Sequence, residues 1–185
     1  MVSFLKKLDW PLLFFTSSII VAGLITLYGI GPRAYDFFNR QIFLFAVSIG
    51  AVLLFSGIDY RIFKNSSFVV VLFYIFSLLL LMTVLQFSPI RAVRSWIVVH
   101  TFQFEPSEIA KLALIILLAK YFSQKHIEIY RVHHVIASFL YTAVPSALVF
   151  IQPDLGSAFV FLAIWFVVLL ASGLKRQHVI GILIM

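Results

Sequence analysis

The sequence has 185 residues, of which 63% are hydrophobic and 11% are charged, with a formal net charge of +7 and no cysteine. Soluble domains are about 45–50% apolar and about 25% charged, so this composition excludes a soluble globular protein. The lack of cysteine excludes disulfides and thiol-based metal or redox sites. In a membrane protein, the positive charge indicates basic loops that fix the topology and contact anionic lipid, rather than a nucleic-acid partner.

Six hydrophobic stretches have about the length of a membrane-spanning helix, which needs roughly 20 apolar residues. They lie at Pro11–Ile30, Gln41–Ser56, Phe68–Phe87, Ser107–Phe122, Val135–Ile151 and Leu155–Leu174. The second and fourth are short, and we expect them to extend into their flanks. A seventh stretch begins near Val179. The pattern predicts an all-α polytopic membrane protein with six full transmembrane helices and the start of a seventh, in a single domain of residues 1–185.

The first hydrophobic stretch is not a signal peptide. It follows Lys6 and Lys7, it has the length of a full span, and it ends at Gly31-Pro32 without a small-residue cleavage pattern. We therefore count it as the first span.

The basic residues predict the orientation of the spans. With a cytoplasmic N-terminus, nine of them fall inside, namely Lys6, Lys7, Arg61, Lys64, Lys120, Lys125, Arg131, Lys175 and Arg176. Four fall outside, namely Arg33, Arg40, Arg91 and Arg94. The opposite orientation would violate the positive-inside rule. The fourth and sixth spans therefore begin at the outer face, with the positive ends of their helix dipoles pointing outward.

The densest group of polar residues lies at these two outward helix starts. Glu108 and Lys111 are three residues apart, which places them on one helix face within pairing distance. Pro106 suits a first helical turn, and acids such as Glu105 favour the positive helix end. Helix capping explains the acids, but it does not explain a lysine one turn deep. The alternative is a polar site in which the lysine holds an anionic group such as phosphate while a carboxylate exchanges a proton.

Other polar residues allow simpler interpretations. Asp154 directly follows Pro153, and an acid at a helix start is good capping chemistry. Arg94 suits a loop charge, although its position outside the membrane runs against the positive-inside trend and invites another role, and Trp96 suits an interfacial aromatic anchor. The histidines of the inner loop lack an acid or cysteine to complete a metal site, so we predict a solvated or lipid-facing surface for His126, His133 and His134. From the residues alone, we infer an outward-facing charged site suited to an amphiphilic anion, and no particular reaction.

Three motifs, in this order along the chain, resemble the SEDS family, the rod-shape and cell-division proteins of the RodA and FtsW type. They are Arg94-Ser95-Trp96-Ile97, Phe104-Glu105-Pro106-Ser107-Glu108-Ile109-Ala110-Lys111 and Gln152-Pro153-Asp154-Leu155-Gly156-Ser157. Ala171-Ser172-Gly173-Leu174 fits the family's exit from its sixth span. The resemblance covers the whole chain and corresponds to the N-terminal half of a ten-helix family member.

The resemblance implies a peptidoglycan glycosyltransferase that polymerises lipid II into glycan strands at the outer face of the bacterial cytoplasmic membrane. It implies a class B penicillin-binding protein and the elongation or division machinery as partners. The implied catalytic residues are Glu108, Lys111 and Asp154, and the implied substrate-binding residues are Arg94, Trp96, Glu105 and Ser107. Glu105 stands where many members have glutamine, which adds a negative charge. The family's best candidate base lies in an outer loop after the seventh span, so we expect this chain to be inactive alone.

Two other functions stay open at this point. A flippase for the lipid-linked precursor would need a similar polar site between spans, and a truncated chain could act through partner binding without catalysis. The short basic N-terminus, Met1 to Lys7, favours the RodA type over the division type. No cofactor can be read from the residues, and a requirement for a divalent cation stays open.

Overall fold

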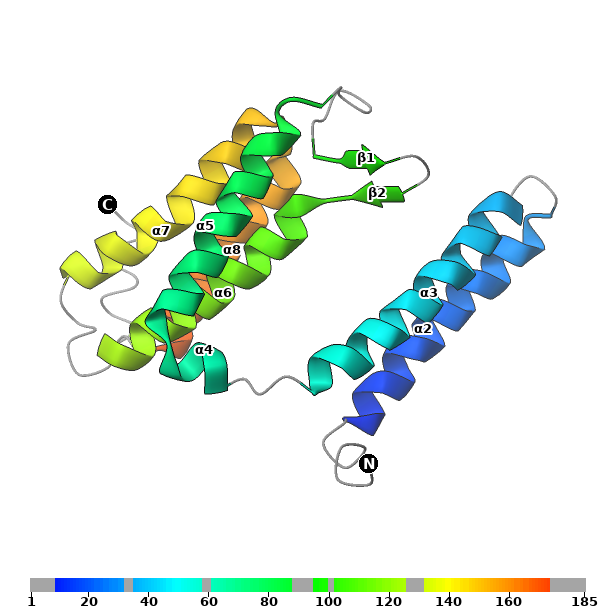
Figure 1. The fold of residues 1–185 in the computed structure, drawn as a ribbon, viewed down its shortest axis with the longest axis horizontal. Helices are drawn as coiled ribbons and strands as arrows, with labels where there is room; N and C mark the ends of the chain where they lie inside the picture. The colour runs from blue at the N-terminus through cyan, green and yellow to red at the C-terminus, as the bar shows by residue number, and fades with distance from the viewer. Residues whose placement is uncertain are drawn as a thin grey trace. The chain divides into compact units, whose positions relative to one another are not determined.

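The computed structural model describes residues 9–31, 35–57, 61–87, 95–99, 102–125 and 132–173 (Figure 1). The chain divides into two compact units, residues 1–60 and residues 61–185. The prediction of a single membrane domain stays a prediction.

The first unit is a pair of adjacent helices, α2 (Trp10–Gly29) and α3 (Tyr35–Ser56). The carboxylate of Asp9 caps α2 by accepting the N–H of Leu12 at 3.1 Å, and Pro11 lies in the first turn. Gly31 follows α2 with φ of +86°, a conformation that glycine adopts without strain. Neither helix contains a buried residue in this structure, and both are largely apolar, apart from a polar start of α3 at Asp36, Asn39, Arg40 and Gln41, which suits a lipid environment.

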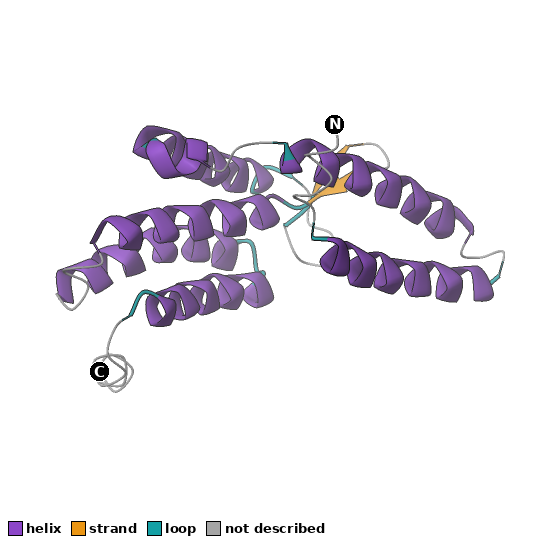
Figure 2. Ribbon diagram, turned by 90° about the horizontal axis from the view of Figure 1, so that it is seen from below, coloured by secondary structure: helices purple, strands orange, loops and turns teal. Residues whose placement is uncertain are grey.

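The second unit contains five helices and a β-hairpin among its described residues. The short helix α4 (Arg61–Asn65) precedes α5 (Ser67–Val84), and the hairpin strands β1 (Ile97–Val99) and β2 (Phe102–Phe104) lead directly into α6 (Pro106–Lys125). Helices α7 (Val132–Ile151) and α8 (Leu155–Ala171) complete the bundle. The strands are antiparallel, with Ile97 opposite Phe104 and Val99 opposite Phe102. Figure 2 shows the hairpin apart from the helical bundle.

The core of the second unit lies between α5, α6, α7 and α8. Its largest fully buried apolar side chains include Leu81 of α5, Leu114 and Leu118 of α6, Val149 of α7 and Phe161 of α8. These residues come from every long helix of the unit, so the four helices share one apolar core.

All six predicted spans coincide with helices. The second extends back to Tyr35 and the fourth on to Lys125, as expected for the two short stretches. By length and composition α2, α3, α5 and α7 can each cross a membrane, and α8 is a shorter apolar helix of 17 residues. Helix α6 has 20 residues but carries more charge than these. The start of the seventh span lies outside the described residues. The described helices thus agree with the predicted multi-pass membrane protein.

The β-hairpin was not predicted. The sequence interpretation treated residues 88–105 as a loop, because three-residue strands are too short to give a clear alternating pattern.

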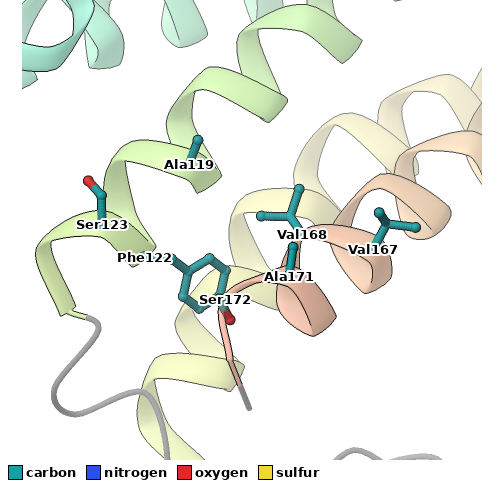
Figure 3. Close-up of a pocket in the computed structure, with 7 residues that line it drawn as sticks. All are labelled: Ala119, Phe122, Ser123, Val167, Val168, Ala171 and Ser172. Atoms are coloured by element: carbon teal, nitrogen blue, oxygen red, sulfur yellow. The ribbon is translucent and has the colours of Figure 1, made fainter.

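An apolar hollow of about 400 Å³ lies between the C-terminal ends of α6 and α8 (Figure 3). Small side chains leave this space, since Ala119 and Ser123 line it from α6, and Ala171 and Ser172 line it from the end of α8. It therefore lies at the opposite end of both helices from the predicted charged site.

Helix α7 contains Pro145, which has no N–H to donate to the carbonyl of Tyr141 four residues earlier. The Tyr74 hydroxyl of α5 donates to that carbonyl at 2.7 Å. A backbone carbonyl without a partner in a membrane interior costs several kcal/mol, so this contact compensates for the proline. It also fixes α5 against α7, two helices that are 67 residues apart at this point.

We predict that Tyr74→Phe destabilises the protein by about 1–3 kcal/mol, because it leaves the Tyr141 carbonyl unsatisfied while keeping the aromatic ring. In a Pro145→Ala background the new N–H of residue 145 can donate to the Tyr141 carbonyl. The loss of stability caused by Tyr74→Phe should therefore be smaller there by about 1 kcal/mol or more. Unfolding of the four proteins of this double-mutant cycle in detergent micelles measures the coupling. Tyr28→Phe, on an exposed tyrosine of α2, is the control and should change stability by less than about 0.5 kcal/mol. Equal costs in both backgrounds would contradict the compensation.

Candidate functional site

The N-termini of α6 and α8 and the residue that leads into the hairpin supply the polar groups of the candidate site. Asp154 is the N-cap of α8, and its Oδ1 accepts the backbone N–H of Ser157 at 3.0 Å. Its other oxygen, Oδ2, accepts the hydroxyl of buried Ser95 at 3.0 Å. Asp154 therefore joins the start of α8 to the base of the hairpin, across 59 residues of sequence.

The environment of Asp154 favours its charged form. Partial burial by itself would raise the pKa of this carboxyl. The hydrogen bonds from Ser157 and from the Ser95 hydroxyl, together with the positive charge of Lys111, outweigh that effect and hold the pKa of Asp154 below its ordinary value. Asp154 is thus a carboxylate at neutral pH, and the charge of Lys111, in the second turn of α6, contributes to its lowered pKa.

Lys111 forms an ion pair with Glu108 in the first turns of α6. Its Nζ lies 2.6 Å from Oε1 of Glu108, as the three-residue spacing predicted. The two side chains differ in exposure: 16% of the Lys111 side chain is accessible, compared with 66% of Glu108. The cation is therefore held mostly inside the protein, while its carboxylate partner reaches out toward solvent.

Glu105 and Ser107 form the entrance to α6. The Ser107 hydroxyl donates to Oε1 of Glu105 at 2.5 Å, and the backbone N–H of Glu108 donates to the Glu105 carbonyl at 3.2 Å. Ser107 is buried and Glu105 is half-buried. These contacts are helix-start interactions, so they support the capping interpretation for Glu105.

Trp96 follows Ser95 and is half-buried where the chain enters β1. The hairpin then returns to Glu105, so its two ends are held by Asp154 of α8 and by the first turn of α6. Arg94 lies outside the described residues. Among the predicted site residues, Lys111 forms an ion pair with Glu108, and Ser107 forms a hydrogen bond with Glu105. The charge of Lys111 also affects the pKa of Asp154.

Two residues of the quoted motifs have contacts that the sequence interpretation missed. Gln152 is 1% exposed, and its Nε2 donates to the carbonyl of Leu81 at 2.8 Å. That carbonyl lies in the last turn of α5. It does not receive the N–H of Leu85 four residues later, because this N–H donates to the Met82 carbonyl at 3.2 Å. Ser95 is the second, through its bond to Asp154. A polar residue in so apolar a chain indicates a specific contact, and this signal was available for both residues. The sequence could not identify their partners, because these are 59 and 71 residues away.

The prediction for the inner-loop histidines needs one correction. His134 is 5% exposed, and its Nδ1 lies 2.8 Å from the hydroxyl of Tyr121. It therefore belongs to the interior of the bundle, because α7 already begins at Val132 and turns this side chain toward α6. His133 is exposed as predicted, and His126 lies outside the described residues.

The site combines a partly enclosed cation, two carboxylates and two outward helix N-termini. Helix N-termini and a lysine together favour an anionic ligand such as a phosphate group. Across the described ranges, no three His, Cys, Asp or Glu side chains gather as metal ligands. The arrangement can therefore bind an anion through Lys111, with Glu108 as its exposed charge partner.

Comparisons with known proteins agree with this architecture. The peptidoglycan glycosyltransferase RodA of Treponema pallidum is 29% identical over 179 residues, which cover 94% of this chain and 41% of that protein. The crystal structure of a rod shape determining protein RodA mutant from Thermus thermophilus matches with a TM-score of 0.81 and 32% identity, over 94% of this chain and 56% of that one. A solved structure of a peptidoglycan synthase complex that coordinates polymerization and crosslinking matches with a TM-score of 0.82 and 31% identity, over 95% of this chain and 51% of that one.

The chain spans about half the length of the relatives it matches. Relatives named FtsW and a stage V sporulation protein E also match, so the comparisons do not separate the elongation type from the division type. The family model for cell cycle proteins of the FtsW, RodA and SpoVE type matches residues 3–185. The resemblance to SEDS proteins is confirmed, and this chain belongs to the FtsW/RodA/SpoVE family.

Proposed function

We propose that this chain is part of a peptidoglycan glycosyltransferase that polymerises lipid II at the outer face of the cytoplasmic membrane. Its relatives support the reaction class, since several are named peptidoglycan glycosyltransferases. The observation that carries the proposal is Lys111, a mostly enclosed cation that pairs with the exposed carboxylate of Glu108 at 2.6 Å and whose charge also acts on Asp154. A lipid-linked pyrophosphate is an amphiphilic anion that suits such a site.

The proposed reaction transfers a growing glycan from its lipid pyrophosphate to the 4-hydroxyl of a second lipid II. The hydroxyl oxygen forms the new bond to the anomeric carbon, the bond to pyrophosphate breaks, and a base takes the hydroxyl proton. Negative charge develops on the leaving pyrophosphate, and a positioned cation lowers the barrier to its departure. We assign that role to Lys111, with the helix N-termini as further positive ends. Arg94 and Trp96 are proposed substrate contacts.

Glu108 and Asp154 have different proposed parts. Glu108 is exposed and paired with Lys111, so it can orient the lysine and exchange a proton with solvent. Both oxygens of Asp154 already accept hydrogen bonds, and its lowered pKa makes it a poor proton donor at neutral pH. We therefore propose that Asp154 positions the hairpin and α8 and contributes to the field at Lys111, while its direct catalytic role stays a prediction. Glu105 and Ser107 would shape the entrance beside the substrate.

The proposed partner is a class B penicillin-binding transpeptidase. One matched structure is described as coordinating polymerization and crosslinking within a peptidoglycan synthase complex, which supports this pairing. The RodA type stays our preferred assignment, on the short basic N-terminus. Polymer formed by the purified longer protein from lipid II would support the enzyme, while translocation without polymer would favour the flippase. Co-purification with the transpeptidase without polymer would favour a non-catalytic partner protein.

We predict that Lys111→Ala in the longer protein lowers the rate of lipid II polymerisation by about 10²-fold or more, because the charge on the leaving pyrophosphate loses its cation. Glu108→Ala should also abolish polymerisation. Gel analysis of glycan strands formed from fluorescent lipid II measures the product, and membrane fractionation checks insertion. Lys64→Gln, an exposed lysine near the opposite end of the bundle, is the charge-matched control and should keep its activity. A polymer yield like that of the wild type from Lys111→Ala would refute the assignment.

A second prediction concerns acid stability. The folded-state pKa of Asp154 is lowered, so its carboxylate stabilises the fold above the ordinary aspartate pKa of about 3.9, and this stabilisation is lost as the pH falls through the folded value. Asp154→Asn keeps a capping side chain but cannot titrate, so its melting temperature should fall less between about pH 6 and pH 3. Ser95→Ala removes one hydrogen bond to the charged form and should move the acid loss to higher pH. Identical acid profiles for the three proteins would contradict this role.

A further inference from the structure

A second cavity, with a polar rim, lies toward the end of the bundle opposite to the candidate site. It has a volume of about 120 Å³ and lies between the start of α5, the last turns of α6 and the middle of α7. Ser67, Lys120 and Gln124 supply its polar rim, and Val70, Val71 and Leu117 supply its apolar wall. A water molecule takes about 30 Å³ in the liquid, so the cavity has room for about four, which is the scale of one small polar group.

The rim carries a positive charge that has no carboxylate partner in the described part of the chain. Lys120 donates a hydrogen bond to the backbone carbonyl of Lys64 at the end of α4. An ammonium has three donors, and among the described residues no carboxylate pairs with this one. Gln124 donates to the Ser67 hydroxyl at 3.3 Å, and this bond holds the last turn of α6 against the first residue of α5. The unpaired charge and the free donors of Lys120 suit an anionic oxygen acceptor.

The wall of the cavity suits a hydrocarbon chain. Val70 and Leu117 are buried, whereas Val71 is 44% exposed and Tyr141 is 38% exposed, so the apolar wall continues onto the surface of the bundle. The basic residues place this end of α5 and α6 at the cytoplasmic leaflet, whose surface is negatively charged because it contains anionic lipids. A rim cation above an apolar wall thus matches a molecule with a charged head and an acyl chain.

We propose that this cavity, lined by Ser67, Lys120 and Gln124 at its rim and by Val70, Val71 and Leu117 at its wall, binds an anionic phospholipid of the inner leaflet. The phosphate accepts hydrogen bonds from Lys120, and an acyl chain lies along Val71 toward the surface. The site is separate from the outward-facing charged site, since it involves the opposite ends of α5 and α6. It requires neither glycosyl transfer nor lipid II.

The test uses the full chain in detergent micelles that contain equal amounts of phosphatidylglycerol and phosphatidylethanolamine. Native mass spectrometry then counts the lipids that remain bound. We expect the wild type to retain phosphatidylglycerol preferentially and Lys120→Gln to lower that preference about fivefold, the factor that corresponds to about 1 kcal/mol for one lysine near an anionic surface. Lys120→Arg should keep the preference, which separates the loss of charge from a loss of fold.

Lys64→Gln is the matched control, because it removes the same charge from the same end of the bundle but its side chain does not line the cavity. We expect it to change the preference less than twofold. Equal effects of Lys64→Gln and Lys120→Gln would overturn the proposal in favour of general surface attraction, and unchanged retention in Lys120→Gln would overturn it outright. Displacement of the phospholipid by millimolar inorganic phosphate would indicate a plain anion site and would also contradict a lipid site.

Discussion

The second unit depends on one constraint, which is that a backbone polar group inside a membrane needs a partner from the protein. Several such groups among the described residues have no partner within their own helix, and a side chain takes its place. Tyr74 bonds to the Tyr141 carbonyl that Pro145 leaves without an N–H, and Gln152 bonds to the Leu81 carbonyl at the end of α5. Asp154 accepts the Ser157 N–H at the start of α8. Because the first two contacts join different helices, satisfying the backbone also fixes the packing of the bundle.

The same contacts position the charged site. Gln152 holds the turn between α7 and α8 against the end of α5, and Asp154, two residues later, receives the Ser95 hydroxyl. The start of α8 is thereby tied both to α5 and to the base of the hairpin, whose other end runs into α6. Lys111 lies one turn into α6, where its charge acts on Asp154. A site made of two helix starts thus rests on hydrogen bonds that satisfy the backbone.

The two ends of the bundle differ in chemistry. The outer end holds a mostly enclosed lysine that pairs with the carboxylate of Glu108, which suits an anion that must bind and leave during a reaction. The inner end holds Lys120 above an apolar wall, with no carboxylate partner within the described ranges, which suits a resident anionic lipid. Lys111 is paired with the carboxylate of Glu108, whereas the ammonium of Lys120 can bind a lipid headgroup of the inner leaflet. The same residue type therefore serves two proposed purposes, according to what surrounds it.

The membrane class, the six helices, the Glu108–Lys111 pair and the acid at the start of α8 were all predictable from the sequence, because hydropathy and capping depend on residues close together in the chain. It did not reveal the hairpin, the burial of His134, or the partners of Tyr74, Ser95 and Gln152. Those partners are 67, 59 and 71 residues away. Helices that are apolar on every side give no periodic signal for which face meets which neighbour. Only the tertiary packing decided those contacts, and with them the environment of Lys111 and Asp154.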